Sequence, residues 1–327
     1  MIAILGDVHF ASLKEYHVKI GEAMISWFST WKYNNPENEL ILTGDIVHTA
    51  VNGGLVIAML ERFVNASRFA VIHIVPGNHD MKRHENVVQL AYEFLRKRPN
   101  VVIYDRDTVA TIQGKKVLML PHYIPQNSHE PPMLEYYSSL YKKYPDTYDL
   151  LVGHFLEEKA SFGGACVKNL DKLSVKKICL GHLHTRMFPE YIGSMYANKS
   201  NEADPTRAAW IFDNAMNCIE DPLPVFCEYL SVEYPEPLPE SNAIVPIYTV
   251  NNCPTEAQAL RQYGPINIRK VIHALNTSTK SSDEIDKASI ENFNVVTLFK
   301  EFLQTRDTPI DRRVASLCLS LLTEITN

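Results

Sequence analysis

The sequence predicts an α/β protein with a layered core and a mainly parallel inner sheet, and three observations carry this prediction. Short apolar runs alternate with segments in which apolar residues recur at helical spacing. The apolar runs end in turns that contain Gly or Pro and a polar residue. The order strand, helix, strand along the chain is typical of parallel sheets. Ligands of such sheets bind beyond the carboxyl ends of the strands.

The individual elements follow from the pattern in chain order. The expected strands are short apolar runs bounded by turns, at residues 2–5, 40–43, 70–75, 116–120, 149–152 and 177–180. The expected helices repeat apolar residues every three or four positions, at residues 20–31, 55–63 and 87–95. A strand-like run at 207–213 is followed by proline-rich breaks and mixed runs, which indicate a small α/β unit.

The composition is that of an ordinary globular chain of 327 residues, with 46% hydrophobic and 21% charged residues, which suits one to three domains. A net charge of −6 gives no support for a generally basic protein that coats nucleic acid, although a metal site could still attract phosphate. The six cysteines include no C-x-x-C pair, so neither a disulfide framework nor a thiolate zinc site is indicated. Without a signal peptide or a run of about 18 apolar residues, we expect a cytoplasmic protein outside the membrane.

Five glycine-containing turns place polar side chains at the expected strand ends. In chain order they read GDVH (6–9), GDIVH (44–48), GNHD (77–80), GH (153–154) and GHLH (181–184). Because each turn follows an apolar run, its Asp, Asn and His side chains would emerge at one rim of the sheet. Glycine permits a sharp turn and leaves room for a ligand close to the backbone.

These side chains are the mixed oxygen and nitrogen ligands that suit Mn²⁺, iron or Zn²⁺. They are too many for one ion, whereas a carboxylate that bridges two ions accounts for all of them. Two ions roughly 3.5–4 Å apart clamp the attacking and leaving oxygens of a phosphoryl transfer, so the pattern indicates phosphoester hydrolysis. A single Gly-Asp turn is often only a helix cap, and a single buried His is more often structural. The prediction therefore rests on the five motifs together.

The ordered set D-x-H, G-D, G-N-H-D, G-H and G-H-x-H resembles the signature of the calcineurin-like metallophosphoesterases. The resemblance implies a β-sandwich flanked by helices and two divalent ions, with Mn²⁺ preferred over Mg²⁺, iron or Zn²⁺. The ligands that it implies are Asp7, His9 and His184 for one ion and Asn78, His154 and His182 for the other, with Asp45 bridging them. His79 matches the family's catalytic histidine, which protonates the leaving oxygen while a metal-bound hydroxide attacks.

Three local features resemble the SbcD-type nucleases of DNA repair and recombination, in a short, phage-like form. His48 stands three residues after Asp45, as in that family's G-D-x-x-H, where the His helps to position the scissile phosphate. The segments VLMLPHYIP (117–125) and YIGS (191–194) are similar to the family's segments before the fourth motif and after the fifth. The resemblance implies a metal-dependent DNA exonuclease or endonuclease that is the nuclease subunit of an SbcCD-like complex.

Two other functions stay open at this point. The first is a small-molecule phosphodiesterase that acts on nucleotides, and the second is a metal-site scaffold that binds a partner without chemistry. The retention of His79 beside the ligands argues against the scaffold. The appended unit and the terminal helices favour the nuclease, because a small-molecule enzyme needs neither.

The expected domains are a nuclease domain at 1–213, a small α/β cap that binds DNA at 214–275 and two C-terminal helices at 285–327, after a polar linker. The apolar stripes of these helices would pack either back onto the nuclease domain or against a partner, and the resemblance implies the coiled coil of an SbcC-type ATPase as that partner. The resemblance also implies a homodimer, which we expect because the helix with Trp27, Phe28 and Trp31 offers more apolar surface than one core face requires; the alternative is that these aromatics are buried within the monomer. The expected location is the bacterial cytoplasm, including that of a phage-infected cell.

Overall fold

The computed structural model describes residues 1–48, 54–82, 85–88, 90–122, 132–160, 166–202, 204 and 206–272. The chain divides into two units, Met1–Ala274 and Leu275–Asn327, and all described residues belong to the first. The polar linker, the two expected C-terminal helices and the last residues of the expected cap lie outside the described residues.

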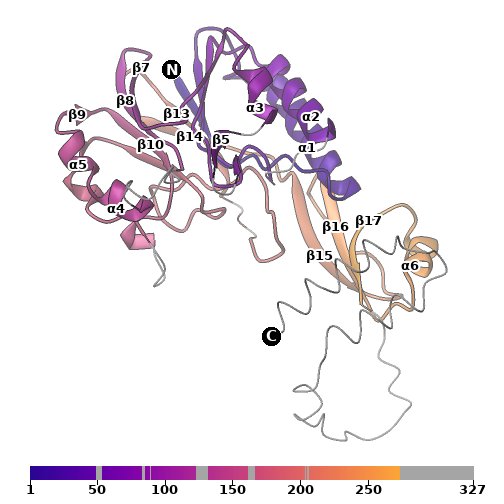
Figure 1. The fold of residues 1–327 in the computed structure, drawn as a ribbon. Coiled ribbons are helices and arrows are strands. Elements are labelled where there is room, and N and C mark those ends of the chain that lie inside the picture. The colour runs from indigo at the N-terminus through magenta and orange to yellow at the C-terminus, as the bar shows by residue number, and fades with distance from the viewer. Residues whose placement is uncertain are drawn as a thin grey trace, which may run out of the picture. The chain divides into compact units, whose positions relative to one another are not determined.

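Two β-sheets and their flanking helices form the layered α/β core that the sequence predicts (Figure 1). The first sheet has the strand order β14-β13-β1-β2-β3-β6. Its strands are β1 (Ile2–Leu5), β2 (Glu39–Leu42), β3 (Val71–Ile74), β6 (Val101–Ile103), β13 (Ala208–Phe212) and β14 (Cys218–Pro222). The strands β1, β2, β3 and β6 are parallel, and β13 runs antiparallel to β1.

The second sheet has the strand order β12-β10-β8-β7. Its strands are β7 (Thr108–Ile112), β8 (Lys115–Leu120), β10 (Leu150–His154) and β12 (Ile178–Gly181). The strands β8, β10 and β12 are parallel, so their carboxyl ends lie at one edge. Two short pairs complete this part of the fold: β4 (Met81–Lys82) with β5 (Glu85–Val88), and β9 (Thr147–Tyr148) with β11 (Ser174–Val175).

Side-chain alternation along the strands builds two cores, one on each face of the first sheet. Leu40 and Leu42 belong to the core shared with the helices α1 (Glu15–Thr30) and α2 (Gly54–Ala66), whereas Ile41 belongs to the core between the two sheets. The remaining helical segments are α3 (Leu90–Leu95), α4 (Met133–Ser138), α5 (Leu140–Lys143), η1 (Glu158–Ala160) and η2 (Leu170–Lys172). Every helix in the described part of the chain is too short or too polar to pass through a lipid bilayer.

The aromatic residues of α1 pack within the chain. Phe28 is fully buried and stacks on Phe63 with 4.1 Å between ring centroids, and Trp31 is also buried. Trp27 packs edge to face against Phe226 with ring centroids 5.8 Å apart. These side chains therefore give no support to the expected homodimer, which stays a prediction from the resemblance.

A smaller α/β unit follows the core. Its parallel sheet has the order β15-β16-β17, with β15 (Cys227–Glu233), β16 (Val245–Asn251) and β17 (Asn267–Val271), and its helix is α6 (Glu256–Tyr263). In Figure 1 these elements are coloured toward the orange end of the scale. Because β14 pairs with β13, the first sheet continues to Pro222, past the boundary predicted at residue 213. The smaller sheet begins at Cys227.

Candidate metal centre

The five motifs meet where the carboxyl ends of the two sheets adjoin. The motifs GDVH, GDIVH and GNHD follow β1, β2 and β3, while His154 and Gly181 are the last residues of β10 and β12. The backbone N–H of His9 donates to the carbonyl of Asp45 at 2.8 Å, and that of His182 donates to Oδ2 of Asp7 at 2.9 Å. Turns from both sheets are therefore joined directly.

The first ligand group consists of Asp7, His9 and His184, together with Asp45. Nε2 of His9 lies 3.0 Å from Nε2 of His184 and 3.8 Å from Oδ2 of Asp45. One potential ligand atom from each of the four residues lies within 4.8 Å of the others, so they could hold a metal ion. When two ring nitrogens bind the same metal ion at about 2.1 Å, they lie about 3 Å apart. This is the separation between Nε2 of His9 and Nε2 of His184.

The second ligand group consists of Asn78, His154 and His182, again together with Asp45. Oδ1 of Asn78 lies 3.0 Å from Nε2 of His154 and 2.9 Å from Nδ1 of His182. Oδ2 of Asp45 lies 3.3 Å from Nε2 of His154. The ligand atoms of Asp45, His154 and His182 also lie within 4.8 Å of one another. Asp45 thus belongs to both groups, and all seven predicted ligands come together.

Three of these seven residues have a left-handed backbone. The φ angle is +52° at His9, +44° at Asp45 and +85° at His182. Such conformations cost about 1–3 kcal/mol for a residue other than glycine and persist only where the surroundings impose them. The hydrogen bonds between the turns impose them here. Backbone strain is therefore concentrated at the candidate site.

Two glycines are required because other groups occupy the space where a side chain would lie. A Cβ on Gly181 would lie 2.4 Å from the carbonyl oxygen of Thr43 and 2.5 Å from Oδ1 of Asp7. A Cβ on Gly77 would lie 2.2 Å from Oδ1 of Asp45. Gly181 thus allows strand ends from the two sheets to approach closely, and Gly77 allows the same for the ends of the neighbouring strands β2 and β3.

The charges at the site call for a cation. Burial raises the pKa of the Asp7 carboxyl to about 7 and lowers that of His182 to about 3. Burial acts to lower the pKa of His154, but the carboxylates of Asp45 and Asp7 outweigh it and raise this pKa to about 10. Oδ1 of Asp7 is buried and accepts no hydrogen bond from the described residues. A divalent ion would supply its missing partner, and the oxygen and nitrogen donors fit Mn²⁺, iron or Zn²⁺.

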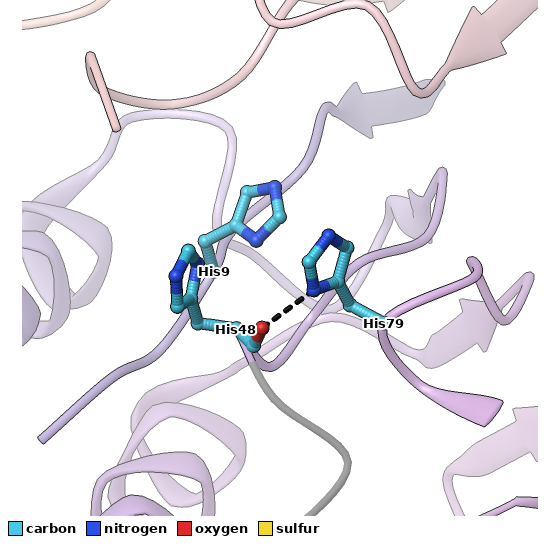
Figure 2. Close-up of side chains that lie close together, drawn as sticks. All are labelled: His9, His48 and His79. Carbon is cyan, nitrogen blue, oxygen red and sulfur yellow. Dashed lines mark hydrogen bonds between the residues drawn. The ribbon is translucent and has the colours of Figure 1, made fainter. Parts of the chain in front are cut away.

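The two predicted catalytic histidines lie beside the first ligand group (Figure 2). Nδ1 of His79 lies 2.5 Å from the backbone carbonyl oxygen of His48, and the rings of the two residues stack with centroids 5.5 Å apart. The ring centroid of His9 is 5.2 Å from that of His79 and 5.4 Å from that of His48. The backbone N–H of His79 donates to Oδ1 of Asp45 at 2.8 Å. These three imidazoles form a third group that could hold a metal ion.

Two acidic residues of the site have roles that the motifs do not predict. Oδ1 of the buried Asp80 accepts from the backbone N–H groups of Ile46 and Val47, and its Oδ2 accepts from that of Gly77. Asp80 therefore fixes the turn that carries Asp45. Oε1 of Glu202 lies 3.0 Å from Nδ1 of His184. Asp80 stands inside GNHD and is visible in the sequence, whereas nothing in the spacing indicates Glu202.

The two flanking segments also lie at the site. In VLMLPHYIP, His122 donates its backbone N–H to the carbonyl of Pro76, and burial lowers the pKa of its imidazole to about 4; residues 123–125 lie outside the described part. In YIGS, the N–H of Ser194 donates to the carbonyl of His184 at 3.1 Å. Gly193 has a φ of +80°, so the turn needs glycine. YIGS therefore supports the loop that carries His184.

Comparison with known proteins identifies the superfamily. The model of the calcineurin-like phosphoesterase family matches residues 1–186, more than half of the chain. The chain belongs to this family. The exonuclease subunit 1 of Enterobacteria phage T4 is 23% identical over 244 residues, which cover 71% of this chain and 69% of the relative.

Two solved structures are also similar to this calcineurin-like phosphoesterase. A protein of unknown function from Aquifex aeolicus has a TM-score of 0.32 and 19% identity, over 54% of this chain and 87% of its own. The phosphopantetheinyl hydrolase of Mycobacterium tuberculosis has a TM-score of 0.33 and 16% identity, over 59% of this chain and 89% of its own. Family membership confirms the resemblance predicted from the five motifs. The chain is a metal-dependent hydrolase of phosphoester bonds.

Proposed function

We propose that this phosphoesterase is a two-metal DNA nuclease, the nuclease subunit of an SbcCD-like complex in DNA repair or recombination. The observation that carries the proposal is the position of Asp45, whose carboxylate belongs to both ligand groups. Two ions that share one carboxylate are the arrangement suited to phosphodiester hydrolysis. Mn²⁺ is the proposed metal, because mixed carboxylate, amide and imidazole donors suit it.

Each ligand group would hold one ion, and Asp45 would bind both. When bound, the two ions activate water as a nucleophile at neutral pH and neutralise charge on the phosphate. The protein keeps the ligands in place through its own contacts. His154 donates from Nδ1 to the carbonyl of Thr43 at 2.8 Å, which directs its Nε2 toward Asp45.

His79 is the proposed general acid. Its Nδ1–H donates to the carbonyl of His48, because a carbonyl oxygen can only accept. The proton that passes to the leaving oxygen is therefore the one on Nε2 of His79. A histidine suits this transfer because a protonated imidazole carries an N–H on each ring nitrogen, so one can be held by a carbonyl while the other is donated. The imidazole of His48, stacked on that of His79, would position the scissile phosphate.

The choice of DNA as substrate rests on the relative and on the appended unit. The match to the phage exonuclease subunit covers 71% of this chain, whereas the phosphoesterase model ends at residue 186. The small α/β unit with β15, β16 and β17 is the proposed cap that contacts DNA. An SbcC-type coiled-coil ATPase, bound through residues 285–327, and a second copy of this chain are the proposed partners. Such an enzyme would act in the bacterial cytoplasm, where its DNA is.

A substrate panel tests the proposal. Purified protein with Mn²⁺ is incubated with linear duplex DNA, covalently closed circular duplex DNA, a cyclic nucleotide and a phosphate monoester. We expect Mn²⁺-dependent cleavage of DNA that is absent from the Asp45→Ala variant purified in parallel. Cleavage of the linear but not the circular DNA would indicate an exonuclease. Cleavage of the small esters alone would contradict the nuclease and favour the nucleotide phosphodiesterase.

A further inference from the structure

His184 is the one ligand of the first group whose second ring nitrogen contacts a carboxylate among the described residues. Its Nε2 lies 3.0 Å from Nε2 of His9, while its Nδ1 lies 3.0 Å from Oε1 of Glu202. The side-chain amide of Asn198 is farther away, with Nδ2 3.5 Å from the same Nδ1, which is too long for a comparable hydrogen bond. Glu202 is therefore the main polar partner of this imidazole outside the ligand group.

The carboxylate of Glu202 is itself held in place. The side chain is buried, and Oε2 accepts from the backbone N–H of Asn198 at 2.8 Å and from that of Lys199 at 3.2 Å. The guanidinium of Arg207 donates to the backbone carbonyl of Glu202 at 2.6 Å and to that of Ser194 at 3.1 Å. Both oxygens and the backbone of Glu202 thus have fixed partners, so Oε1 presents a rigid acceptor to His184.

A fixed acceptor at Nδ1 determines whether Nε2 of the same imidazole has a free lone pair for a metal ion. A neutral imidazole has one N–H, and a carboxylate acceptor draws that N–H to Nδ1. The lone pair is then on Nε2, and the direction of the hydrogen bond also fixes the plane of the ring. Carboxylates that orient ligating histidines in this way typically contribute 10–100-fold to metal affinity.

We propose that Glu202 is a positioning residue that sets the tautomer and ring plane of His184 for the cation held by the first ligand group. This inference rests on the proposed two-metal centre but not on DNA as the substrate. In the second group the same task is done by the carbonyl of Thr43, which accepts from His154. Glu202 is thus specific to one of the two ions.

A structural role for Glu202 would have a different signature. The loop at 197–202 also contacts the smaller α/β unit, because Tyr229 of β15 donates from its hydroxyl to the carbonyl of Asn198 and Arg269 of β17 donates to Oγ of Ser200. If Glu202 only shaped this loop, its removal would change thermal stability while the affinity for both ions stayed the same. The two roles can therefore be separated by metal binding without any substrate.

Calorimetric titration of the metal-free, full-length protein with Mn²⁺ tests the inference. Wild type should bind two ions; if it binds one or none, the proposed centre fails and the inference with it. With two ions in wild type, Glu202→Ala should weaken one of them about 10–100-fold and leave the other within about 2-fold. Glu202→Gln, which keeps an acceptor for Nδ1–H, should recover most of this loss.

Glu228→Gln is the matched control, because Glu228 lies beside the same loop and accepts from Ser241 rather than from a ligand. It should bind both ions as wild type does. Unchanged Mn²⁺ binding in Glu202→Ala, or an equal loss of both ions, would overturn the inference. If Glu202→Ala does not fold, Glu202→Leu decides, because leucine fills the space but offers no acceptor to Nδ1–H: one ion weakened about 10-fold or more supports the role, and two unchanged ions overturn it.

Discussion

The two ligand groups differ in what orients their histidines. In the second group, His154 donates to the main-chain carbonyl of Thr43, directly after β2. In the first group, His184 contacts the side chain of Glu202, which lies 18 residues farther along the chain. His154 is therefore oriented by a strand end itself, whereas His184 depends on a side chain from a loop outside the sheet.

The orientation of these two histidines therefore depends on the sequence in different ways. A main-chain carbonyl is present whatever residue occupies its position, so this orientation of His154 needs only correct strand pairing. The first group can be altered by a single substitution far from the motifs. Substitution of Asp45, which belongs to both groups, should weaken the binding of both ions. Substitution of His79, which lies beside the groups, should leave both ions bound.

The largest effect is expected from Asp45→Ala, which breaks both groups at once. Its carboxylate oxygen Oδ2 lies 3.8 Å from Nε2 of His9 and 3.3 Å from Nε2 of His154. Removal should weaken both ions by more than the 10–100-fold typical of residues that only orient ligands, and hydrolysis should fall below detection. Metal analysis and an activity assay of the same preparation check this. Retention of one tightly bound ion would show that Asp45 serves a single group.

His79→Ala should separate chemistry from metal binding. Loss of a general acid commonly reduces the rate about 10²–10⁴-fold, and we expect this fall in kcat while both ions are retained. Inductively coupled plasma analysis of the variant beside Asp45→Ala measures the contrast. Equal loss of metal in the two variants would move His79 into the ligand set.

Gly181→Ala should damage the junction between the groups to a smaller extent. The added methyl would meet the carbonyl of Thr43 and the carboxylate of Asp7, so it disturbs one contact in each group. Overpacking of this kind costs about 1–3 kcal/mol, and the midpoint of thermal unfolding should fall by several degrees along with Mn²⁺ affinity.

The matched control for this change is Gly54→Ala at the first residue of α2, where a Cβ meets open space among the described residues. It should be neutral or more stable by about 0.4–1 kcal/mol, because alanine reduces the entropy of the unfolded chain. If Gly181→Ala and Gly54→Ala have the same midpoint of thermal unfolding and the same Mn²⁺ affinity, the close approach at Gly181 does not determine the geometry of the site.

The smallest effect is expected away from both groups, at Asp107. Its carboxylate accepts from the ammonium of Lys143 and from the hydroxyls of Tyr136 and Tyr144. Burial acts to raise its pKa, but these donors outweigh burial and lower it. Asp107→Asn should reduce the free energy of unfolding by about 1–2 kcal/mol at neutral pH, after allowance for the exposed Lys143.

The pH dependence of that loss has a defined sign. A carboxyl with a lowered pKa in the folded state stabilises the fold above its unfolded pKa, near 3.9, and loses this contribution as the pH falls through the folded value. In urea unfolding, the difference between wild type and Asp107→Asn should therefore begin to shrink below about pH 4 and continue to shrink as the pH falls further. Asp146→Asn, which breaks the exposed pair with Lys116, should show no measurable change at any pH. A constant difference between wild type and Asp107→Asn would contradict the assignment.

Much of the fold and the site could be predicted because parallel strands bring their carboxyl ends to one edge. That rule places Asp7, Asp45 and Asn78 at the end of the first sheet, and the structure also brings His154 and His182 of the second sheet to them. The helix expected from residue 87 starts at Leu90, because Glu85–Val88 pairs as a strand. A short apolar run suits either element, so periodicity alone does not decide.

Other features carry no signal in the sequence. Glu202 belongs to a loop without periodicity, and its contact with His184 depends on how that loop folds back onto the site. The same holds for β14, whose exposed strand Cys218–Pro222 lacks the apolar run that predicts β1, β2 and β3. The contacts of Phe28 and Trp31 show a related limit, because an aromatic side chain suits a core as well as an interface.

The shared role of Asp45 is the central claim, and electron paramagnetic resonance of the protein with two equivalents of Mn²⁺ tests it most directly. Two Mn²⁺ ions about 3.5–4 Å apart and joined by one carboxylate are magnetically coupled. We predict a coupled spectrum in wild type and in His79→Ala, and its absence in Asp45→Ala. A spectrum of two isolated Mn²⁺ ions in the wild-type protein would contradict the account.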